Sequence, residues 1–332
     1  MTAGTERLGA RIAYLGPEGT FTHEAVRRWT AAGGAEPPER SDAALEPEPL
    51  ATVREVHDAV ASGAAGRGVV AIESSVEGYV VPSLDALVGS PDVVAVDEVV
   101  LDISFDAFVR PGHADPSRLR EASAHPHGLA QCTRFVAEHG LLPVPASSNA
   151  AACRDLADHQ VAFGPRLCGE LYDLETLATG VEDFAGARTR FLVLCRRDGA
   201  PVAWAPRRAS GTGPWRTMVA VTPVVTGPGV LARVTAEFAE RGVNMSSLVE
   251  RPLKVRERQY VFVVTLDGAP WEPQVRDLFG ALLGAGDSLK VLGAFPVAAD
   301  GPGLDGVLPD HAPTGSVRRD DGGADLARGL LW

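Results

Sequence analysis

The sequence predicts an α/β protein in which two lobes of alternating strands and helices precede a smaller domain. Short apolar strands alternate with amphipathic helices over residues 11–163, a pattern typical of α/β layers with mostly parallel strands. A segment rich in Arg, Gly and Pro, 196–214, then interrupts this alternation. After it, the order strand-helix-strand-strand-helix-strand over about 80 residues predicts a ferredoxin-like domain.

The first lobe is predicted at about residues 10–95, with a returning segment at 186–198. The turn 16–20 separates its first strand from its first helix, and 33–49 is rich in Gly, Pro and Glu and is expected to be a loop. Its other predicted elements are strands 11–15, 68–72 and 93–103 and helices 21–32 and 52–62.

The second lobe is predicted at about residues 96–185. It contains a strand from Phe105, helices 128–139 and 149–158, and a small buried strand 161–163. The strand 191–195 then returns to the first lobe. Together the lobes form a domain at 10–198, and we expect a ligand cleft between them.

The C-terminal domain is predicted at 216–298, after a linker at 199–215. Its expected strands are 217–222, 243–248, 259–266 and 289–295, and its expected helices are 229–241 and 272–283. The Gly- and Asp-rich segment 299–332 is predicted to be disordered.

Composition excludes several classes of function. A net charge of −12 argues against general binding to nucleic acid or to a membrane surface. No run approaches the roughly 20 apolar residues of a membrane span, and the first eleven residues lack the features of a signal peptide, so a cytoplasmic protein is expected. The four cysteines are scattered, which favours buried thiols over disulfides or a metal site.

Lysine is unusually rare. Lys254 and Lys290 are the only two, so no residue before 254 can form a Schiff base. The sequence also lacks a P-loop, a dinucleotide-binding glycine motif and metal-ligand spacing. We therefore expect neither a cofactor nor a metal.

The most informative segment is 187–194, where a polar, basic turn leads directly into an apolar strand. Arg188, Thr189 and Arg190 place a hydroxyl and two guanidinium groups at the start of this strand. Such a site can donate a proton and bind an anion. The same Thr-Arg-Phe triplet occurs at 133–135 inside a predicted helix, where Phe135 is expected to face the core and Arg134 the solvent.

The chain resembles two-domain prephenate dehydratases. The resemblance is carried by four stretches in family order, AYLGPEGTF (13–21), VAIESSVEG (70–78), TRF (189–191) and GVL (229–231). It implies a catalytic domain of the two-lobed, type II periplasmic-binding-protein kind, followed by a regulatory ACT domain. It also implies dehydration of prephenate with loss of CO₂ to give phenylpyruvate, a carbon–oxygen lyase reaction in phenylalanine biosynthesis. The protein is then expected to be a homodimer or homotetramer.

The resemblance also assigns site residues, and each has a structural alternative. Thr189 would assist departure of the hydroxyl, or would simply begin a strand. Arg190 would bind a substrate carboxylate or orient Thr189, or would be a surface residue. Gln131 would face the cleft, or would lie on a helix surface. The remaining expected catalytic residue is Ser74, and the expected substrate-binding residues are Glu18, Gly19, Thr20, Glu73, Ser75 and Arg188. Thr20 could instead be a plain helix N-cap.

The sequence departs from the family pattern at several positions. Ser74 replaces a common asparagine, Ala124 a common serine, and Gly186 or Ala187 an asparagine before the Thr-Arg-Phe triplet. Each lost hydrogen bond to a charged substrate is worth about 1.5–3 kcal/mol.

The ACT-like segments also depart in part from the family pattern. Val249-Glu250-Arg251-Pro252 replaces a usual Glu-Ser-Arg-Pro, while Gly229, Val230 and Leu231 resemble a Gly-Ala-Leu motif. These two segments are expected to frame a phenylalanine site. The alternative is an ACT fold that serves only dimerisation.

Two other functions remain open at this stage. A prephenate decarboxylase would lose CO₂ but retain the hydroxyl, giving a non-aromatic product through a carboxy-lyase reaction. A non-catalytic sensor would use the cleft and the ACT module to bind a small molecule. Use of arogenate, and a role in primary or specialised metabolism, are not decided by the sequence.

Overall fold

The computed structural model describes residues 11–34, 45–211, 213–253 and 259–297, with 316, 317 and 322. Residues 1–298 form one compact unit and 299–332 a second; the fold below is that of the first. Lys254 lies outside the described residues. So does the segment 299–332 predicted to be disordered, apart from positions 316, 317 and 322.

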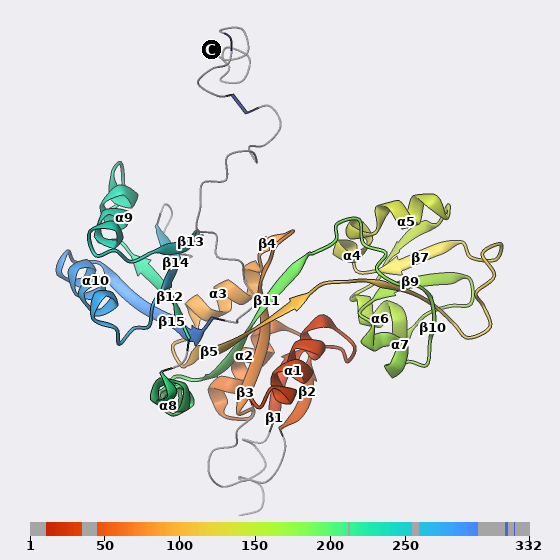
Figure 1. Cartoon of the computed structure of the whole chain (residues 1–332), viewed down its shortest axis with the longest axis horizontal. Helices are drawn as coiled ribbons and strands as arrows, with labels where there is room; N and C mark the ends of the chain where they lie inside the picture. Colours follow the sequence, from red (N-terminus) through yellow and green to blue (C-terminus); the bar gives the residue numbers. More distant parts are fainter. Residues whose placement is uncertain are drawn as a thin grey trace, which may run out of the picture. The chain divides into compact units, whose positions relative to one another are not determined.

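The large sheet of the chain joins the first lobe to the C-terminal domain (Figure 1). Its order is β13 (Met245–Pro252), β14 (Tyr260–Asp267), β12 (Trp215–Thr222), β15 (Ser288–Pro296), β5, β11, β3, β1 and β2, with the short β4 beside β3. The first-lobe strands are β1 (Arg11–Leu15), β2 (Glu46–Leu50), β3 (Arg67–Ser74), β4 (Gly78–Tyr79), β5 (Val93–Asp102) and β11 (Arg188–Arg196). Its helices are α1 (Phe21–Ala31), α2 (Val53–Ser62) and α3 (Val81–Gly89).

The second lobe has its own sheet, of order β10-β6-β9-β7-β8. The chain passes between the two sheets twice, after β5 and before β11 (Figure 1). The second-lobe strands are β6 (Asp106–Val109), β7 (Glu121–Ala124), β8 (Leu142–Pro145), β9 (Gln160–Gly164) and β10 (Glu175–Ala178). Its helices are α4 (Pro126–Gln131), α5 (Thr133–Glu138), α6 (Asn149–Arg154) and α7 (Leu167–Leu171).

The C-terminal domain has the predicted βαββαβ order. Its elements are β12 (Trp215–Thr222), α9 (Val230–Glu240), β13 (Met245–Pro252), β14 (Tyr260–Asp267), α10 (Pro273–Gly284) and β15 (Ser288–Pro296). The strands pair antiparallel in the ferredoxin-like order, and β15 makes one parallel bridge to β5, between Gly293 and Ala95. The two-lobed α/β domain and the following βαββαβ domain are therefore confirmed.

Hydrophobic clusters lie on both faces of the large sheet. On one face, α1 packs on alternate residues of the strands, such as Tyr14 and Phe191. On the other face, α2 and α3 pack on Val70 and Leu192, and this cluster continues into the C-terminal strands through Met218. The other face of the C-terminal sheet is covered by α9 and α10 (Figure 1). The two side-chain faces of β11 thus have different surroundings.

Several local predictions were wrong. The supposed linker 196–214 contains helix α8 (Ala200–Ser210) after a short 3-10 turn, Arg197–Gly199. The supposed loop 33–49 ends inside strand β2, and the single helix predicted at 128–139 is divided at Cys132 into α4 and α5. Both sheets are mixed rather than mostly parallel. In the large sheet β11 runs antiparallel to β3 and β5, and in the second-lobe sheet β6 runs antiparallel to β10 and β9.

Other details agree with the sequence or add to it. All four cysteines are free and buried, as predicted. Phe135 is buried and Arg134 exposed, also as predicted. Across the part of the chain that the structure describes, no helix is long and apolar enough to cross a membrane.

Candidate active site

Residues expected in the site come together at one edge of the large sheet. The strands β1 and β3 are parallel neighbours, so their C-terminal ends lie at the same edge. β11 runs antiparallel beside β3, so its first residues lie there too. In this ladder Thr189 is opposite Ser74 and Arg190 is opposite Glu73. The turn after β1, the turn after β3 and the start of β11 are therefore adjacent.

Thr189 is half-buried at this edge. Its other strand neighbour is the buried Leu101 of β5. Among the described residues its hydroxyl has no hydrogen-bond partner, which leaves it available to a ligand. The geometry is therefore compatible with Thr189 as a proton donor.

The two serines after β3 bind the backbone around them. The Ser74 hydroxyl accepts from the N–H groups of Val76 and Glu77, at 3.2 and 3.3 Å. The Ser75 hydroxyl accepts from the Arg188 N–H at 2.9 Å, and the Ser75 N–H donates to the Arg188 carbonyl at 2.8 Å. These contacts fix the turn after β3 against the residue before Thr189.

Both arginines beside Thr189 are paired with carboxylates. Arg188 Nε donates to Asp102 at 2.8 Å. Arg190 Nη1 donates to Glu73 at 2.6 Å, and its Nε and Nη2 donate to Glu98 at 3.2 and 3.0 Å. Of the two roles expected for Arg190, the geometry favours orientation over direct binding of a substrate carboxylate.

The loop 16–20 is closely tied to the helix that follows it. The Thr20 hydroxyl accepts from the His23 N–H at 3.2 Å and donates to the Leu15 carbonyl, so Thr20 is the N-cap of α1. The Gly19 N–H donates to His23 Nδ1 at 3.1 Å. Thr20 is therefore a helix N-cap, the structural role expected for it, and its contact with a substrate stays a prediction.

The second lobe contacts the same loop. Tyr172 donates its hydroxyl to the Glu18 carbonyl at 2.7 Å, and Cys168 Sγ approaches the Gly19 carbonyl at 3.2 Å. Gly19 has a φ of +81°, and an added Cβ would lie 3.1 Å from Cys168 Sγ. A glycine is thus required where the two lobes meet.

Tyr14 and His23, which the sequence did not single out, lie beneath this loop. Their rings stack with centroids 5.1 Å apart. Burial raises the pKa of the Tyr14 phenol and lowers the pKa of His23, so Tyr14 stays protonated and His23 neutral. The Tyr14 hydroxyl is buried without a hydrogen-bond partner among the described residues. No local sequence signal distinguishes Tyr14 from an ordinary strand aromatic.

Polar groups of the second lobe lie after β7 and β8. Asn149 Oδ1 accepts from the His125 N–H at 2.9 Å, and His125 Nδ1 caps α4. Gln131, the last residue of α4, is half-buried, and its carbonyl accepts from the Asp183 N–H. The contacts seen among the described residues do not join Gln131 to Thr189. Asn149 was recognised in the sequence only as the start of a helix.

Comparison with known proteins places these features in a family. The family model described as Prephenate dehydratase matches residues 12–199. The prephenate dehydratase of Mycobacterium leprae is 37% identical over 324 residues, which cover 96% of this chain and 97% of that protein. The prephenate dehydratase of Mycobacterium marinum is 37% identical over 294 residues, which cover 86% of this chain and 89% of that protein.

The chain belongs to the prephenate dehydratase family.

Solved structures agree with this assignment. The prephenate dehydratase of Arthrobacter aurescens, in complex with L-Phe, has a TM-score of 0.72 at 30% identity and covers 89% of this chain and 92% of its own. A protein called GqqA, described as a novel type of quorum quenching acylase, has a TM-score of 0.71 at 25% identity and covers 87% and 98%. The fold alone therefore does not decide the reaction, whereas the higher sequence identity favours prephenate dehydratases.

The range matched by the prephenate dehydratase family model includes the strand ends described above. Glu18, Ser74 and Thr189 all lie within 12–199, and the C-terminal domain begins after it. The curated relative from Mycobacterium leprae extends the similarity over nearly the whole chain.

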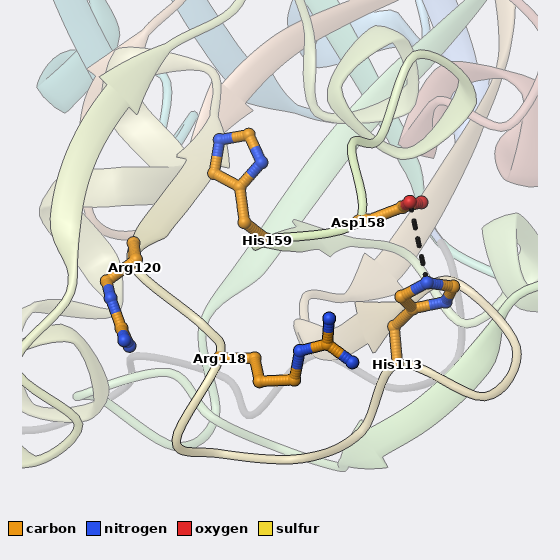
Figure 2. A pocket seen from close by; sticks show the side chains of 5 residues that line it. All are labelled: His113, Arg118, Arg120, Asp158 and His159. Carbon is orange, nitrogen blue, oxygen red and sulfur yellow. Dashed lines mark ion pairs between the residues drawn. The ribbon is translucent and has the colours of Figure 1, made fainter.

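A separate hollow lies in the second lobe, beside the segments that lead into β7 and β9 (Figure 2). It has a volume of about 320 Å³ and is lined by His113, Arg118, Arg120, Asp158 and His159. The first three of these residues lie between β6 and β7, and the last two directly precede β9. His125 and Asn149, in contrast, follow the C-terminal ends of β7 and β8. Asp158 is paired with His113, as Figure 2 shows, and with Arg110. We assign no part of the reaction to this hollow.

Proposed function

We propose that this chain converts prephenate into phenylpyruvate, CO₂ and water, as a step toward phenylalanine. The observation that carries the proposal is the place of Thr189 at the start of β11. There it is half-buried, opposite Ser74, and its hydroxyl is not bound to another described residue. Membership of the prephenate dehydratase family supports the choice of substrate.

Thr189 assists departure of the ring hydroxyl in this reaction. The C–CO₂ bond breaks, its electron pair completes the aromatic ring, and the C–OH bond breaks as the hydroxyl takes up a proton that solvent supplies and leaves as water. An aliphatic alcohol is too weak an acid to ionise fully, so Thr189 donates a hydrogen bond that strengthens as charge develops on the leaving oxygen. Such preorganised donors stabilise a transition state more than the ground state.

The substrate dianion binds near the first turn of α1. The backbone N–H groups at the N-terminus of α1 carry partial positive charge and favour anions. The Gly19 N–H and the Thr20 hydroxyl are already engaged, which leaves the backbone N–H groups of Thr20, Phe21 and Thr22 as donors for a carboxylate. Ser74, Ser75 and Glu73 shape the opposite wall through their contacts with β11.

One product assay tests the proposal. Purified protein is incubated with prephenate, and the products are identified by mass spectrometry and by the ultraviolet absorption of phenylpyruvate in base. Phenylpyruvate with release of CO₂ is expected. A product that retains the ring hydroxyl would instead identify a decarboxylase, and intact prephenate with a ligand-dependent rise in Tm would identify a sensor. A parallel incubation with an acyl-homoserine lactone, a common acylase substrate in quorum quenching, should give no hydrolysis.

The C-terminal domain is proposed to be an ACT regulatory domain that binds phenylalanine. Its βαββαβ order supports this, as does similarity to a prephenate dehydratase solved with L-Phe. Arg251, expected in that site, instead donates to Asp85 of α3 at 2.8 and 3.1 Å. The proposed site therefore consists of Gly229, Val230 and Leu231 at the start of α9, with Glu250 and Pro252 of β13.

The proposed oligomer follows from the same strand. β13 is at the end of the strand order of the large sheet. An edge strand of this kind offers backbone donors and acceptors to a second chain. We propose that two copies pair through β13 into a homodimer.

A further inference from the structure

Four charged residues form a row across the large sheet, from the C-terminal domain to the candidate active site. They are Arg216 on β12, Glu98 on β5, Arg190 on β11 and Glu73 on β3. Their charges alternate. We call them the ion-pair row.

Each neighbouring pair in the row is in contact. Arg216 Nη1 lies 3.8 Å from Glu98 Oε1, while Arg190 Nη2 lies 3.0 Å from Glu98 Oε2. Arg190 Nη1 lies 2.6 Å from Glu73 Oε2. Within the row, Glu98 therefore presents one carboxylate oxygen to each domain, and Arg190 divides its donors between Glu98 and Glu73. Arg216 Nε also lies 3.7 Å from Asp267 Oδ1 of β14.

The centre of the row is buried. The side chain of Glu98 is 1% exposed and that of Arg190 18% exposed, while Arg216 and Glu73 are 28% and 29% exposed. A buried carboxylate must be compensated by cations and hydrogen bonds, because its desolvation is costly. Loss of the Arg216 cation therefore leaves the Glu98 carboxylate less compensated, which favours a closer approach of Arg190 to Glu98.

The row lies on the opposite face of β11 from Thr189. Successive strand residues point to opposite faces, so Arg190 shares a face with Leu192 and the C-terminal cluster, and Thr189 shares the α1 face with Phe191. The pairing of β3 with β11 contains a β-bulge, in which Ile72 of β3 is the extra residue. Beyond the bulge, Glu73 lies opposite Arg190 and Ser74 lies opposite Thr189. Movement of Arg190 relative to Glu73 thus displaces Thr189 relative to Ser74.

We propose that Arg190 is a positioning residue for Thr189 and Ser74, and that Arg216 makes its position depend on the C-terminal domain. The kinetic part of this inference rests on the proposed dehydratase function. When β12 shifts, Arg216 leaves Glu98, Arg190 moves toward Glu98 and away from Glu73, and the paired ends of β3 and β11 change register or spacing. The C-terminal domain thereby changes turnover without contacting the substrate.

The first test is kinetic. Arg216→Gln should lower kcat for prephenate about three- to tenfold with KM within about twofold, since only the placement of Thr189 changes. Arg216→Lys, which keeps the charge, should restore at least half of the loss. The matched control is Arg207→Gln: Arg207 of α8 pairs with Asp97, the residue next to Glu98, at 3.4 Å, and should leave kcat unchanged.

A double-mutant cycle separates coupling from general damage. Glu98→Gln combined with Arg216→Gln should be no slower than Glu98→Gln alone, because the contact is already absent. Multiplicative losses in kcat would overturn the proposal. If Glu98→Gln does not fold, the comparison of Arg216→Gln with Arg207→Gln decides alone.

The second test does not depend on activity. The Ser75 and Arg188 amides are bonded across β3 and β11, so their hydrogen exchange reports the alignment of these strands. Arg216→Gln should speed exchange in peptides covering 73–78 and 186–191 by about threefold or more, and Arg207→Gln should not. Unchanged exchange in Arg216→Gln overturns the inference even if the wild type makes phenylpyruvate. If Arg216→Gln exchanges faster but the wild type has no dehydratase activity, only the proposed function is refuted.

Discussion

The two Thr-Arg-Phe triplets show how one sequence acquires different roles in different surroundings. Thr133 starts α5, where Asp183 accepts from its N–H at 2.9 Å and from its hydroxyl. Thr189 starts β11, and its hydroxyl is not bound to another described residue. Thr189→Val should lower turnover at least about tenfold. Its free energy of unfolding should change by less than about 0.5 kcal/mol, because valine suits a strand and no described contact is lost.

Thr133→Val is the matched control for this prediction. It should cost about 1 kcal/mol of stability through the lost hydrogen bond from its hydroxyl to Asp183, while kcat stays near that of the wild type. Initial rates with prephenate and urea unfolding measure both effects. A Thr189→Val protein as fast as wild type would remove Thr189 from the mechanism.

His57 of α2 predicts an acid-sensitive fold. It is 4% exposed, and burial lowers its pKa to about 4. The unfolded chain, with a pKa near 6.5, therefore binds more protons between these values, so stability present above pH 6.5 is lost as the pH falls toward 4. This one group should cost about 2 kcal/mol between pH 7 and pH 5.

His57→Leu should remove most of that loss. Both ring nitrogens lack hydrogen-bond partners among the described residues, so leucine sacrifices no polar contact there. Urea unfolding of both proteins at pH 7 and pH 5 checks the prediction. Equal pH dependence in the two proteins would contradict it.

At this scale the sequence predicts residue types at the site better than their partners. The hydroxyl at the start of a strand follows from local pattern, and Thr189 is found there. Glu98, however, is 92 positions from Arg190 and shares its strand with two other acidic residues, Asp97 and Asp102. Which carboxylate meets which guanidinium depends on strand order and on the shift at Ile72, and neither is encoded locally.

Whole elements were predicted where periodicity was strong and missed where composition was misleading. α8 contains two prolines, Pro201 and Pro206, and follows a Gly, so its sequence resembles a linker. Its Ala200 packs beside Val94 and Cys195, and Trp204 packs there and donates to the Ala294 carbonyl at 2.7 Å. Tertiary contacts therefore hold a helix that local propensity disfavours. Likewise β2, with two prolines, is an edge strand beside β1.

The position of α9 depends on a buried ion pair. Arg233 binds Asp287 through two nitrogens, at 2.8 and 2.7 Å, and the Asp287 side chain is 0% exposed. Arg233→Ala leaves that carboxylate buried without its cation, so the free energy of unfolding should fall by about 3 kcal/mol or more. Arg154→Ala, which breaks the exposed pair with Asp155, should change stability little. Urea unfolding of both variants measures the difference, and equal small losses would contradict the prediction.

At the scale of the molecule, one glycine permits the two domains to share a sheet. An added Cβ at Gly293 would lie 2.5 Å from the Ala95 Cβ and 2.8 Å from its carbonyl oxygen. Gly293→Ala should therefore separate β15 from β5. We expect Gly293→Ala to unfold in two transitions where the wild type unfolds in one, or protease to cleave between β11 and β12 about tenfold faster. Gly280→Ala, where a Cβ meets nothing within 4 Å, should keep the wild-type transition.

The sequence predicted both domains but not the sheet that joins them. The order of elements in each domain follows from local periodicity, whereas the single bridge from β15 to β5 joins positions about 200 residues apart through a close backbone approach. No motif marks such a junction. The dependence of Thr189 on Arg216 could therefore not be predicted from the sequence.

The proposed catalytic and regulatory sites should be separable by mutation. L-Phenylalanine at about 100 times its Kd should stabilise the folded chain by about 2.7 kcal/mol and raise Tm by several degrees. Thr189→Val should keep that rise while losing turnover, because Thr189 lies in the catalytic domain. Glu250→Ala should show the reverse. Turnover should be retained, while the rise in Tm with phenylalanine and any inhibition of turnover by phenylalanine should be weaker, because Glu250 is exposed on β13 near the proposed ligand. Thermal unfolding with and without L-phenylalanine measures both. If phenylalanine leaves the Tm of the wild type unchanged, the C-terminal domain serves association alone.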